Sequence, residues 1–224
     1  MTHEAEQPLR ITPEMLAPRA AADHEGRTDF ERGMSYLPPA TMLVLVVLVV
    51  VFMAEVSDGS LTTAGAGLVG DYALVRDEVL AGEWWRVLTA AFLHGSGQHL
   101  IGNGISLYIL GMACEHAFGT QRMFAAYLVA ALGGSVFSMA AQPGPSVGAS
   151  GAIFGLMGAI IVVLHRQRDV LYLRDKRIGV VIGVWGAYTF LMGALNPMID
   201  NAAHFGGFVT GAVAAMVLRP RVVR

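Results

Sequence analysis

Ser150 has the sequence setting of a serine nucleophile, because it begins an apolar segment directly after a turn. The local sequence is Gly148-Ala149-Ser150-Gly151, followed by a long apolar run. Pro143 and Pro145 keep the preceding residues out of a helix, so the spacing predicts a helix that starts at about residue 150. A serine at a helix start is also a common N-cap, and the Gly-x-Ser-Gly pattern alone does not separate the two roles.

Other apolar segments carry the remaining groups that such a nucleophile needs. His99 and Asn103 are four residues apart and share one face of a predicted helix, and His204 lies near the start of the last apolar segment. Polar groups inside a membrane are costly and usually face the interior of a helix bundle. A serine, a histidine base and donors for an oxyanion are the parts of an acyl-transfer site. Hydrogen bonding between helices is the alternative role for His99 and Asn103.

The composition predicts that the elements holding these residues lie in a membrane. The chain is 54% hydrophobic and only 14% charged, with a mean hydropathy of +0.55, which is typical of an all-α polytopic membrane protein. Cys114 is the single cysteine, so an internal disulfide is excluded. We expect no metal and no cofactor, and a net charge of -2 gives no indication of nucleic-acid binding.

Six apolar segments are long enough, with their flanks, to be membrane spans. Residues 1–36 are rich in acids and predicted to form a soluble, flexible tail, residues 55–97 form a long mixed loop, and residues 219–224 form a basic tail. The predicted membrane domain covers residues 37–218, with spans at about 37–54, 98–113, 123–141, 150–164, 179–195 and 202–218.

Basic residues predict the orientation of these spans. With a cytoplasmic N-terminus, 13 of the 15 basic residues fall on the cytoplasmic side, and Arg76 and Arg86 remain outside. Both termini are therefore predicted to be cytoplasmic.

The candidate residues are predicted to lie at the same depth in the membrane. Ser150 and His204 each precede the cytoplasmic end of their apolar segment by 14 residues, at Leu164 and Leu218. At 1.5 Å per residue this places both roughly 21 Å from the cytoplasmic edge, and roughly 9 Å below the outer edge of a ~30 Å core. Asn103 falls within about one turn of the same plane.

Four motifs together resemble the rhomboid family of intramembrane serine proteases, over about residues 83–218. They are Glu83-x-Trp85-Arg86, His94-x4-His99-x3-Asn103, Gly148-x-Ser150-Gly151 and Ala203-His204-Phe205-Gly206-Gly207. The resemblance implies a six-helix rhomboid-like bundle with a Ser150/His204 catalytic dyad. It also implies an oxyanion hole from His99, Asn103 and the Ser150 backbone N–H, and a structural role for Glu115. Supporting roles are expected for His94, Trp85, Arg86, Phe154, Gly151 and Gly207.

Phe154 departs from the tyrosine that is common at this position in the family. Its ring can stack beneath His204, but it has no phenolic hydroxyl to donate a hydrogen bond. Gly151 and Gly207 are expected to let two helices approach closely, which would bring Ser150 to His204. Asp200 is the carboxylate closest to His204 in the sequence, and its assistance to the base is left open.

The function predicted from these features is cleavage of transmembrane segments of other proteins near the outer membrane face. The expected partners are such substrates and the lipid bilayer, with homo-oligomer formation left open. The expected location is the plasma membrane of a bacterium. A catalytically inactive rhomboid-like protein that escorts transmembrane clients is the main alternative. Three other classes do not fit the sequence. It has no His-Glu-x-x-His motif of a metalloprotease and no aspartate within the predicted spans, as an aspartyl protease would need. It also shows no paired broken helices of the kind found in transporters.

Overall fold

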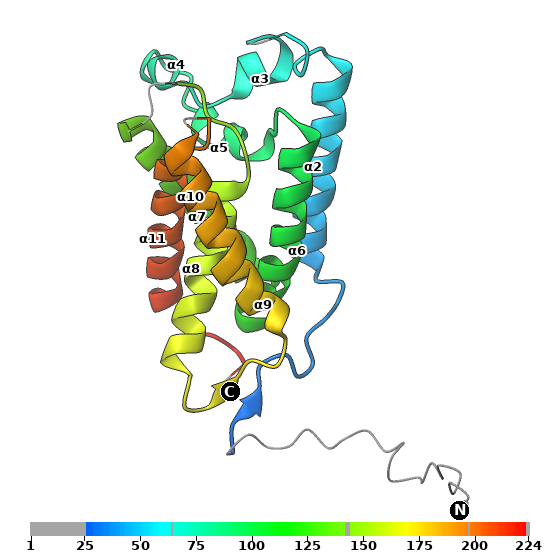
Figure 1. Cartoon of the computed structure of the whole chain (residues 1–224), viewed down its shortest axis with the longest axis vertical. Helices are drawn as coiled ribbons and strands as arrows, with labels where there is room; N and C mark the ends of the chain where they lie inside the picture. The colour runs from blue at the N-terminus through cyan, green and yellow to red at the C-terminus, as the bar shows by residue number, and fades with distance from the viewer. Residues whose placement is uncertain (1–25, 64, 142–143, 197, 223–224) are drawn as a thin grey trace, which may run out of the picture.

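The computed structural model describes residues 26–63, 65–141, 144–196 and 198–222, and it is a helical bundle (Figure 1). The long helices arise from the apolar runs of the sequence, and Pro38 and Pro39 begin the first of them. The elements in chain order are β1 (Thr28–Asp29), α2 (Pro39–Ser57), α3 (Gly67–Tyr72), α4 (Arg76–Leu80), α5 (Arg86–Thr89), η1 (Ala90–Phe92), α6 (Gly97–Phe118), α7 (Thr120–Ala141), α8 (Ser150–Arg166), β2 (Leu171–Tyr172), α9 (Lys176–Val180), η2 (Val181–Trp185), α10 (Gly186–Leu195) and α11 (Asn201–Val217).

Helix α8 is the centre of the bundle. Most of its residues from Gly151 to Ile160 are buried, and α6, α7 and α11 pack around it (Figure 1). Its high content of glycine and alanine makes this packing close. Ser150, at the first position of the helix, is thereby held by a helix that is mostly buried.

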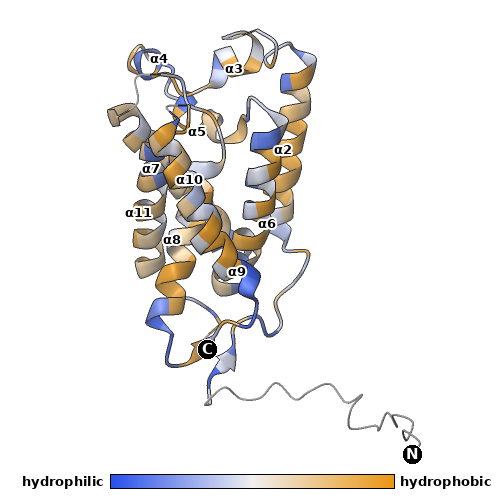
Figure 2. Ribbon diagram, in the orientation of Figure 1, coloured by the Kyte–Doolittle hydropathy of each residue, from blue (hydrophilic) through white to orange (hydrophobic). Residues whose placement is uncertain are grey.

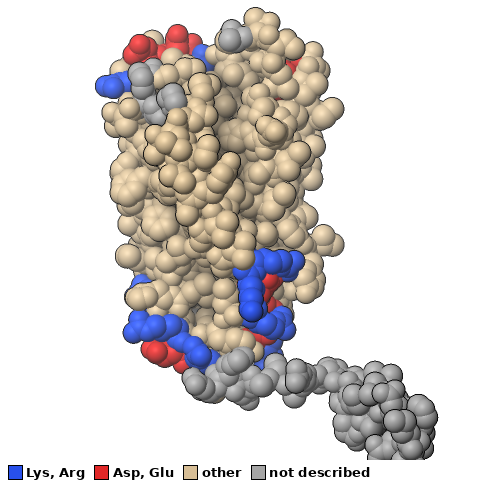
Figure 3. Space-filling view, in the orientation of Figure 1, with Lys and Arg blue, Asp and Glu red and all other residues tan. Residues whose placement is uncertain are grey.

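Three helices are long and apolar enough to cross a membrane: α2, α7 and the continuous helical stretch Lys176–Leu195. Helices α8 and α11 are apolar but shorter. Hydrophobic residues cover the middle of the bundle (Figure 2), and the charged side chains gather at its two ends (Figure 3). These features indicate an integral membrane protein. The six apolar segments of the sequence are helical, and α6 continues to Phe118, past the predicted end at residue 113. The count of membrane spans stays a prediction.

Glycines let α8 and α11 touch backbone to backbone. A Cβ on Gly207 would overlap the carbonyl of Gly151, and one on Gly211 would overlap the carbonyl of Gly155. On the other helix, a Cβ on Gly158 would overlap the carbonyl of Phe208. The close approach expected at Gly151 and Gly207 is therefore present, and it extends along both helices.

The described part of the expected tail, residues 26–36, is packed against the α8–α9 connection. Strand β1 pairs in parallel with β2, a pairing that the sequence did not predict. Glu31 accepts hydrogen bonds from the backbone N–H groups of Arg174 and Asp175, at 3.0 and 2.8 Å, and Phe30 is buried. We call residues 26–36 the strap. The predicted flexibility of residues 1–25 lies outside the described residues.

Buried carboxylates fasten the ends of α2. At its start, Glu115 accepts hydrogen bonds from the N–H groups of Ala40 and Thr41, at 3.0 and 2.9 Å, and from the Thr41 hydroxyl. These N–H groups have no partner within their own helix, so Glu115 acts as a cap from another helix. At the other end, Glu55 binds the loop before α6, as described below.

Candidate active site

Ser150 is the first residue of α8, and its side chain does not cap the helix. The N-cap position is Ala149, which makes no side-chain hydrogen bond. The turn before it needs Gly148, whose φ of +128° is disfavoured for residues with a side chain. The Gly148 N–H donates to the carbonyl of Ala90 at 2.9 Å, which anchors the turn. The Ser150 hydroxyl is consequently free to interact across the bundle.

His204 meets this hydroxyl directly. The distance between His204 Nε2 and Ser150 Oγ is 2.8 Å, and the His204 side chain is buried. Helix α11 places the ring: Asp200 caps its first turn through a hydrogen bond from the Ala203 N–H at 2.8 Å, and the glycine contact described above brings α11 onto α8. The two residues predicted to share one depth are thus hydrogen-bonded partners.

Aromatic rings support the face of His204. Phe154, one turn after Ser150, stacks on the imidazole with ring centroids 4.5 Å apart and planes 21° apart. Phe190 meets the imidazole edge-on at 6.1 Å, and Trp185 stacks on the other side of Phe154 at 5.1 Å. The expected stacking of Phe154 on His204 is present. Two further rings, Trp185 of η2 and Phe190 of α10, also pack against Phe154.

His99 and Asn103 lie beside the turn that leads into Ser150. A Cβ on Gly148 would lie 2.5 Å from His99 Cε1 and 3.7 Å from Asn103 Nδ2, so both side chains approach this turn. Asn103 Nδ2 is buried and has no hydrogen-bond partner among the described residues. A buried donor without a partner is costly, and an incoming anionic oxygen would satisfy it.

The hydrogen-bond partner of His99 determines what its ring can donate. Its Nδ1 lies 2.9 Å from the carbonyl oxygen of His94, which can only accept, so the hydrogen of the neutral ring is on Nδ1. Nε2, the atom facing Gly148, then carries no hydrogen unless the ring is doubly protonated. Asn103 can therefore donate a hydrogen bond towards this turn as it stands, whereas His99 Nε2 can do so only after its ring gains a second proton.

The loop that carries His94 is held by a carboxylate that the sequence analysis missed. Glu55, fully buried at the end of α2, accepts hydrogen bonds from the backbone N–H groups of His94 and Gly95, at 3.0 and 2.9 Å. Burial and the nearby His99 lower the pKa of His94 to about 3, so this ring is neutral at physiological pH. His94 is thus a packing neighbour of His99, with ring centroids 5.2 Å apart.

Arg86 fastens the loop between α2 and α6. Its side chain is buried, and Nη1 donates to the carbonyls of Gly70 and Ala73, both at 2.9 Å, while Nε pairs with Glu83 at 2.5 Å. Trp85 is 38% exposed and packs on Trp84 at 6.2 Å. Among the described residues, neither Arg86 nor Trp85 has a recorded contact with Ser150, so both hold the loop and not the dyad.

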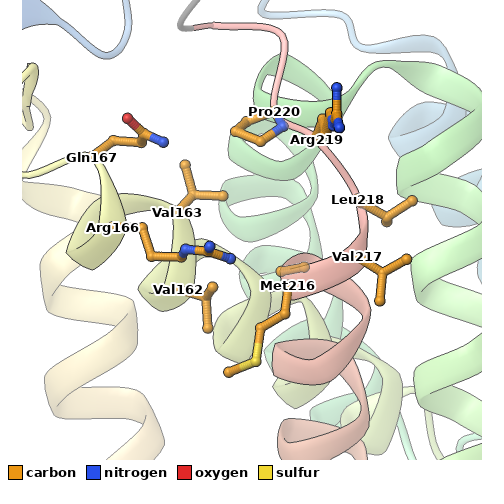
Figure 4. Close-up of a pocket in the computed structure, with 10 residues that line it drawn as sticks. Val162, Val163, Arg166, Gln167, Met216, Val217, Leu218, Arg219 and Pro220 are labelled. Atoms are coloured by element: carbon orange, nitrogen blue, oxygen red, sulfur yellow. The ribbon is translucent and has the colours of Figure 1, made fainter.

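A separate cavity of about 410 Å³ lies at the other end of α8. Its walls are the C-terminal turns of α8 and α11, with the side chains of Val162, Val163, Met216 and two arginines around it (Figure 4). Ser150 is 16 residues from Arg166, or roughly 24 Å along the helix. This cavity contains no nucleophile or histidine and is not part of the candidate active site. Within the described residues, no cluster of three or more histidines, cysteines or carboxylates has the arrangement of a metal site.

Comparison with known proteins identifies the class to which this fold and site belong. The Rhomboid domain model matches residues 81–221. The chain belongs to the rhomboid family.

Two of the curated relatives that the chain matches are named as proteases. It is 34% identical over 177 residues to Rhomboid protease GluP of Bacillus subtilis, covering 79% of this chain and 34% of the relative. It is 30% identical over 207 residues to Rhomboid protease AarA of Providencia stuartii, covering 81% and 73%. It also matches Inactive RHOMBOID-like protein 8 of Arabidopsis thaliana, at 33% identity over 57% of this chain and 36% of the relative. The chain spans only about a third of the length of GluP.

Proposed function

We propose that the protein is an intramembrane serine endopeptidase that cleaves transmembrane segments of other membrane proteins. The observation that carries this proposal is the 2.8 Å contact between Ser150 Oγ and Nε2 of the buried His204, in a member of the rhomboid family. A serine hydroxyl hydrogen-bonded to an imidazole nitrogen is the nucleophile and base pair of serine hydrolases.

The proposed reaction proceeds through an acyl-enzyme. His204 Nε2 takes the proton of the Ser150 hydroxyl as Oγ forms a bond to the peptide carbonyl carbon. The imidazolium then gives that proton to the leaving amine as the C–N bond breaks. Water attacks the resulting ester with His204 again as the base, which releases the acid product and restores Ser150.

Three donors are available for the tetrahedral oxyanion. Asn103 Nδ2 is a buried donor without a partner, the Ser150 backbone N–H lies at the open start of α8, and His99 adds Nε2–H when its ring is doubly protonated. The helix N-terminus adds a favourable field for negative charge. One such donor contributes about 3 kcal/mol to the transition state in a water-excluded site.

The proposed topology has six spans with both termini in the cytoplasm. Ser150 then lies below the outer surface, where it meets peptide bonds near the outer end of a substrate helix. Such a bond must be unwound before attack, because in an intact helix its carbonyl is hydrogen-bonded. We expect cleavage after a small residue such as alanine, with a helix-weakening glycine or proline nearby. Substrate would enter beside α10, where Trp185 and Phe190 close the site.

The alternative is a client-binding protein without catalysis, and the similarity to an inactive Arabidopsis relative is the reason to test it. Purified protein in proteoliposomes would be treated with a fluorophosphonate that labels activated serines, and separately given a model transmembrane substrate. We expect labelling and cleavage by the wild type, and neither by Ser150→Ala. Ser57→Ala, which removes an exposed hydroxyl bonded only to the Ala54 carbonyl, is the matched control and should behave as the wild type. Cleavage by Ser150→Ala at the wild-type rate would refute the proposal.

A further inference from the structure

The second ring nitrogen of His204 faces a side chain that has no role in the dyad. Nδ1 lies 3.4 Å from Oδ1 of Asn201, the first residue of α11. Asp200 instead accepts hydrogen bonds from the Ala203 N–H and the Ser138 hydroxyl, and the contact recorded at His204 Nδ1 is with Asn201. Asn201 is therefore the acceptor that the structure places at Nδ1.

A second hydrogen bond fixes which way the Asn201 amide points. Its Nδ2 donates to the carbonyl of Phe190, on α10, at 3.0 Å. Because a carbonyl carries no hydrogen, the NH2 end of the amide must face Phe190 and the oxygen must face His204. The hydrogen of the neutral His204 ring is consequently on Nδ1. Nε2 is left with a free lone pair towards Ser150, which is the tautomer that a general base requires.

Helix α10 is shaped to admit this amide. A Cβ built on Gly193 would lie 2.5 Å from Cγ and 2.7 Å from Nδ2 of Asn201, and closer still to Oδ1. Any other residue at position 193 would push the amide away from both of its partners. Asn201 thus fills a slot between α10 and α11 that only glycine leaves open.

We propose that Asn201 is the positioning residue of His204, and that it makes the orientation of the base depend on the position of α10. This inference rests on the proposed function. Gly186 is the only buried residue of α10 among the described residues, and η2 before it is a turn of π-helix, a feature that is frequent at functional sites. An outward movement of α10 would take the Phe190 carbonyl with it and free the Asn201 amide to rotate. His204 therefore has its reactive tautomer when α10 is in the position seen here, with the Phe190 carbonyl bonded to Asn201.

The first test separates the acceptor from the donor of the amide. Asn201→Ala removes both, whereas Asn201→Asp keeps an oxygen for the Nδ1–H and loses the donor to Phe190. We expect Asn201→Ala to lower both kcat and the rate of fluorophosphonate labelling about tenfold, with KM within twofold of the wild type. Asn201→Asp should label at least threefold faster than Asn201→Ala. Asn196→Ala removes one side-chain hydrogen bond from the same turn, to the Met198 N–H at 3.0 Å, and should leave both rates unchanged.

The second test asks whether α10 acts through Asn201. Gly193→Ala fills the slot and should lower labelling to the level of Asn201→Ala, and the double variant should lose nothing further. Gly179→Ala makes the same change on the same helical stretch, where a Cβ meets nothing within 4 Å, and should have no effect. Additive losses in the double variant would show that position 193 affects the site by another route and would overturn the coupling to α10.

A spectroscopic measurement reads the tautomer itself. In protein labelled with 15N-histidine, with His204→Ala used to assign the signals, the wild type should show His204 as the Nδ1–H form, and Asn201→Ala a mixture of both forms. A wild-type ring with its hydrogen on Nε2 would overturn the inference. Wild-type protein that neither labels nor cleaves would instead refute the proposed function. Normal labelling by Asn201→Ala in an active protein would refute the role of Asn201 alone.

Discussion

Replacing Gly207 by alanine tests the contact that brings the two halves of the site together. A Cβ at this position would overlap the carbonyl oxygen of Gly151 and lie 2.7 Å from its carbonyl carbon, whereas ordinary contacts begin at 3.4 Å, so α8 and α11 must separate by more than about 0.7 Å. Ser150 is adjacent to Gly151. A shift of this size would lengthen its 2.8 Å contact with His204 to about 3.5 Å or more, at or beyond the limit of a hydrogen bond.

A displacement of about 1 Å in a catalytic geometry costs on the order of 100-fold in rate. We therefore expect Gly207→Ala to cleave a transmembrane peptide about 100-fold more slowly than the wild type in proteoliposomes, and Gly207→Val to be inactive. Circular dichroism and the melting temperature would establish that the helices remain, and Gly179→Ala is the control for the added methyl group. A folded Gly207→Ala that cleaves within twofold of the wild-type rate would refute the reasoning.

Four further outcomes are expected. Asn103→Ala should cleave about 10- to 1000-fold more slowly and still react with a fluorophosphonate, because Asn103 stabilises charge and forms no bond; total loss of folding would instead indicate a structural hydrogen bond. Cys114→Ala should retain full activity, since the thiol is buried against the Leu156 carbonyl, and loss of labelling would contradict this. Glu115→Ala should lower the free energy of unfolding by about 3 kcal/mol, measured by denaturant titration in detergent, because it leaves buried N–H groups of α2 unpaired. Mass spectrometry of the cleavage products should place the cut in the outer third of the substrate helix, and a cut in the cytoplasmic third would contradict the predicted depth.

The helices and the central pair of the site were predictable from the sequence. Apolar runs determine helices in a membrane protein because every backbone group in lipid must be satisfied within the segment. Equal spacing from the ends of two such runs then placed Ser150 and His204 at one level, and the structure joins them. The count of spans and their orientation stay predictions, since three helices meet the length and hydropathy expected for crossing a membrane.

Contacts between a side chain and a distant backbone were not predictable. Glu55 was assigned to a loop, but it binds the N–H groups of His94 and Gly95 across about 40 residues of sequence. Backbone N–H groups are the same at every position, so nothing in the sequence marks the partner of such a carboxylate. Asn201 was missed for the same reason, because its donor contact is the carbonyl of Phe190. Strands β1 and β2 have two residues each, too few for an alternating pattern.

The strap has a consequence for how the protein meets membranes of different thickness. It joins the start of α2 to the connection between α8 and α9, through the β1–β2 pairing and the two hydrogen bonds of Glu31. Helices tied at one end cannot slide past one another along the bilayer normal. In a thinner or thicker bilayer the bundle must then adjust by tilting as a unit or by deforming the surrounding lipid. Hydrophobic mismatch would thus change the angle of the whole protein and leave Ser150 and His204 in register with each other.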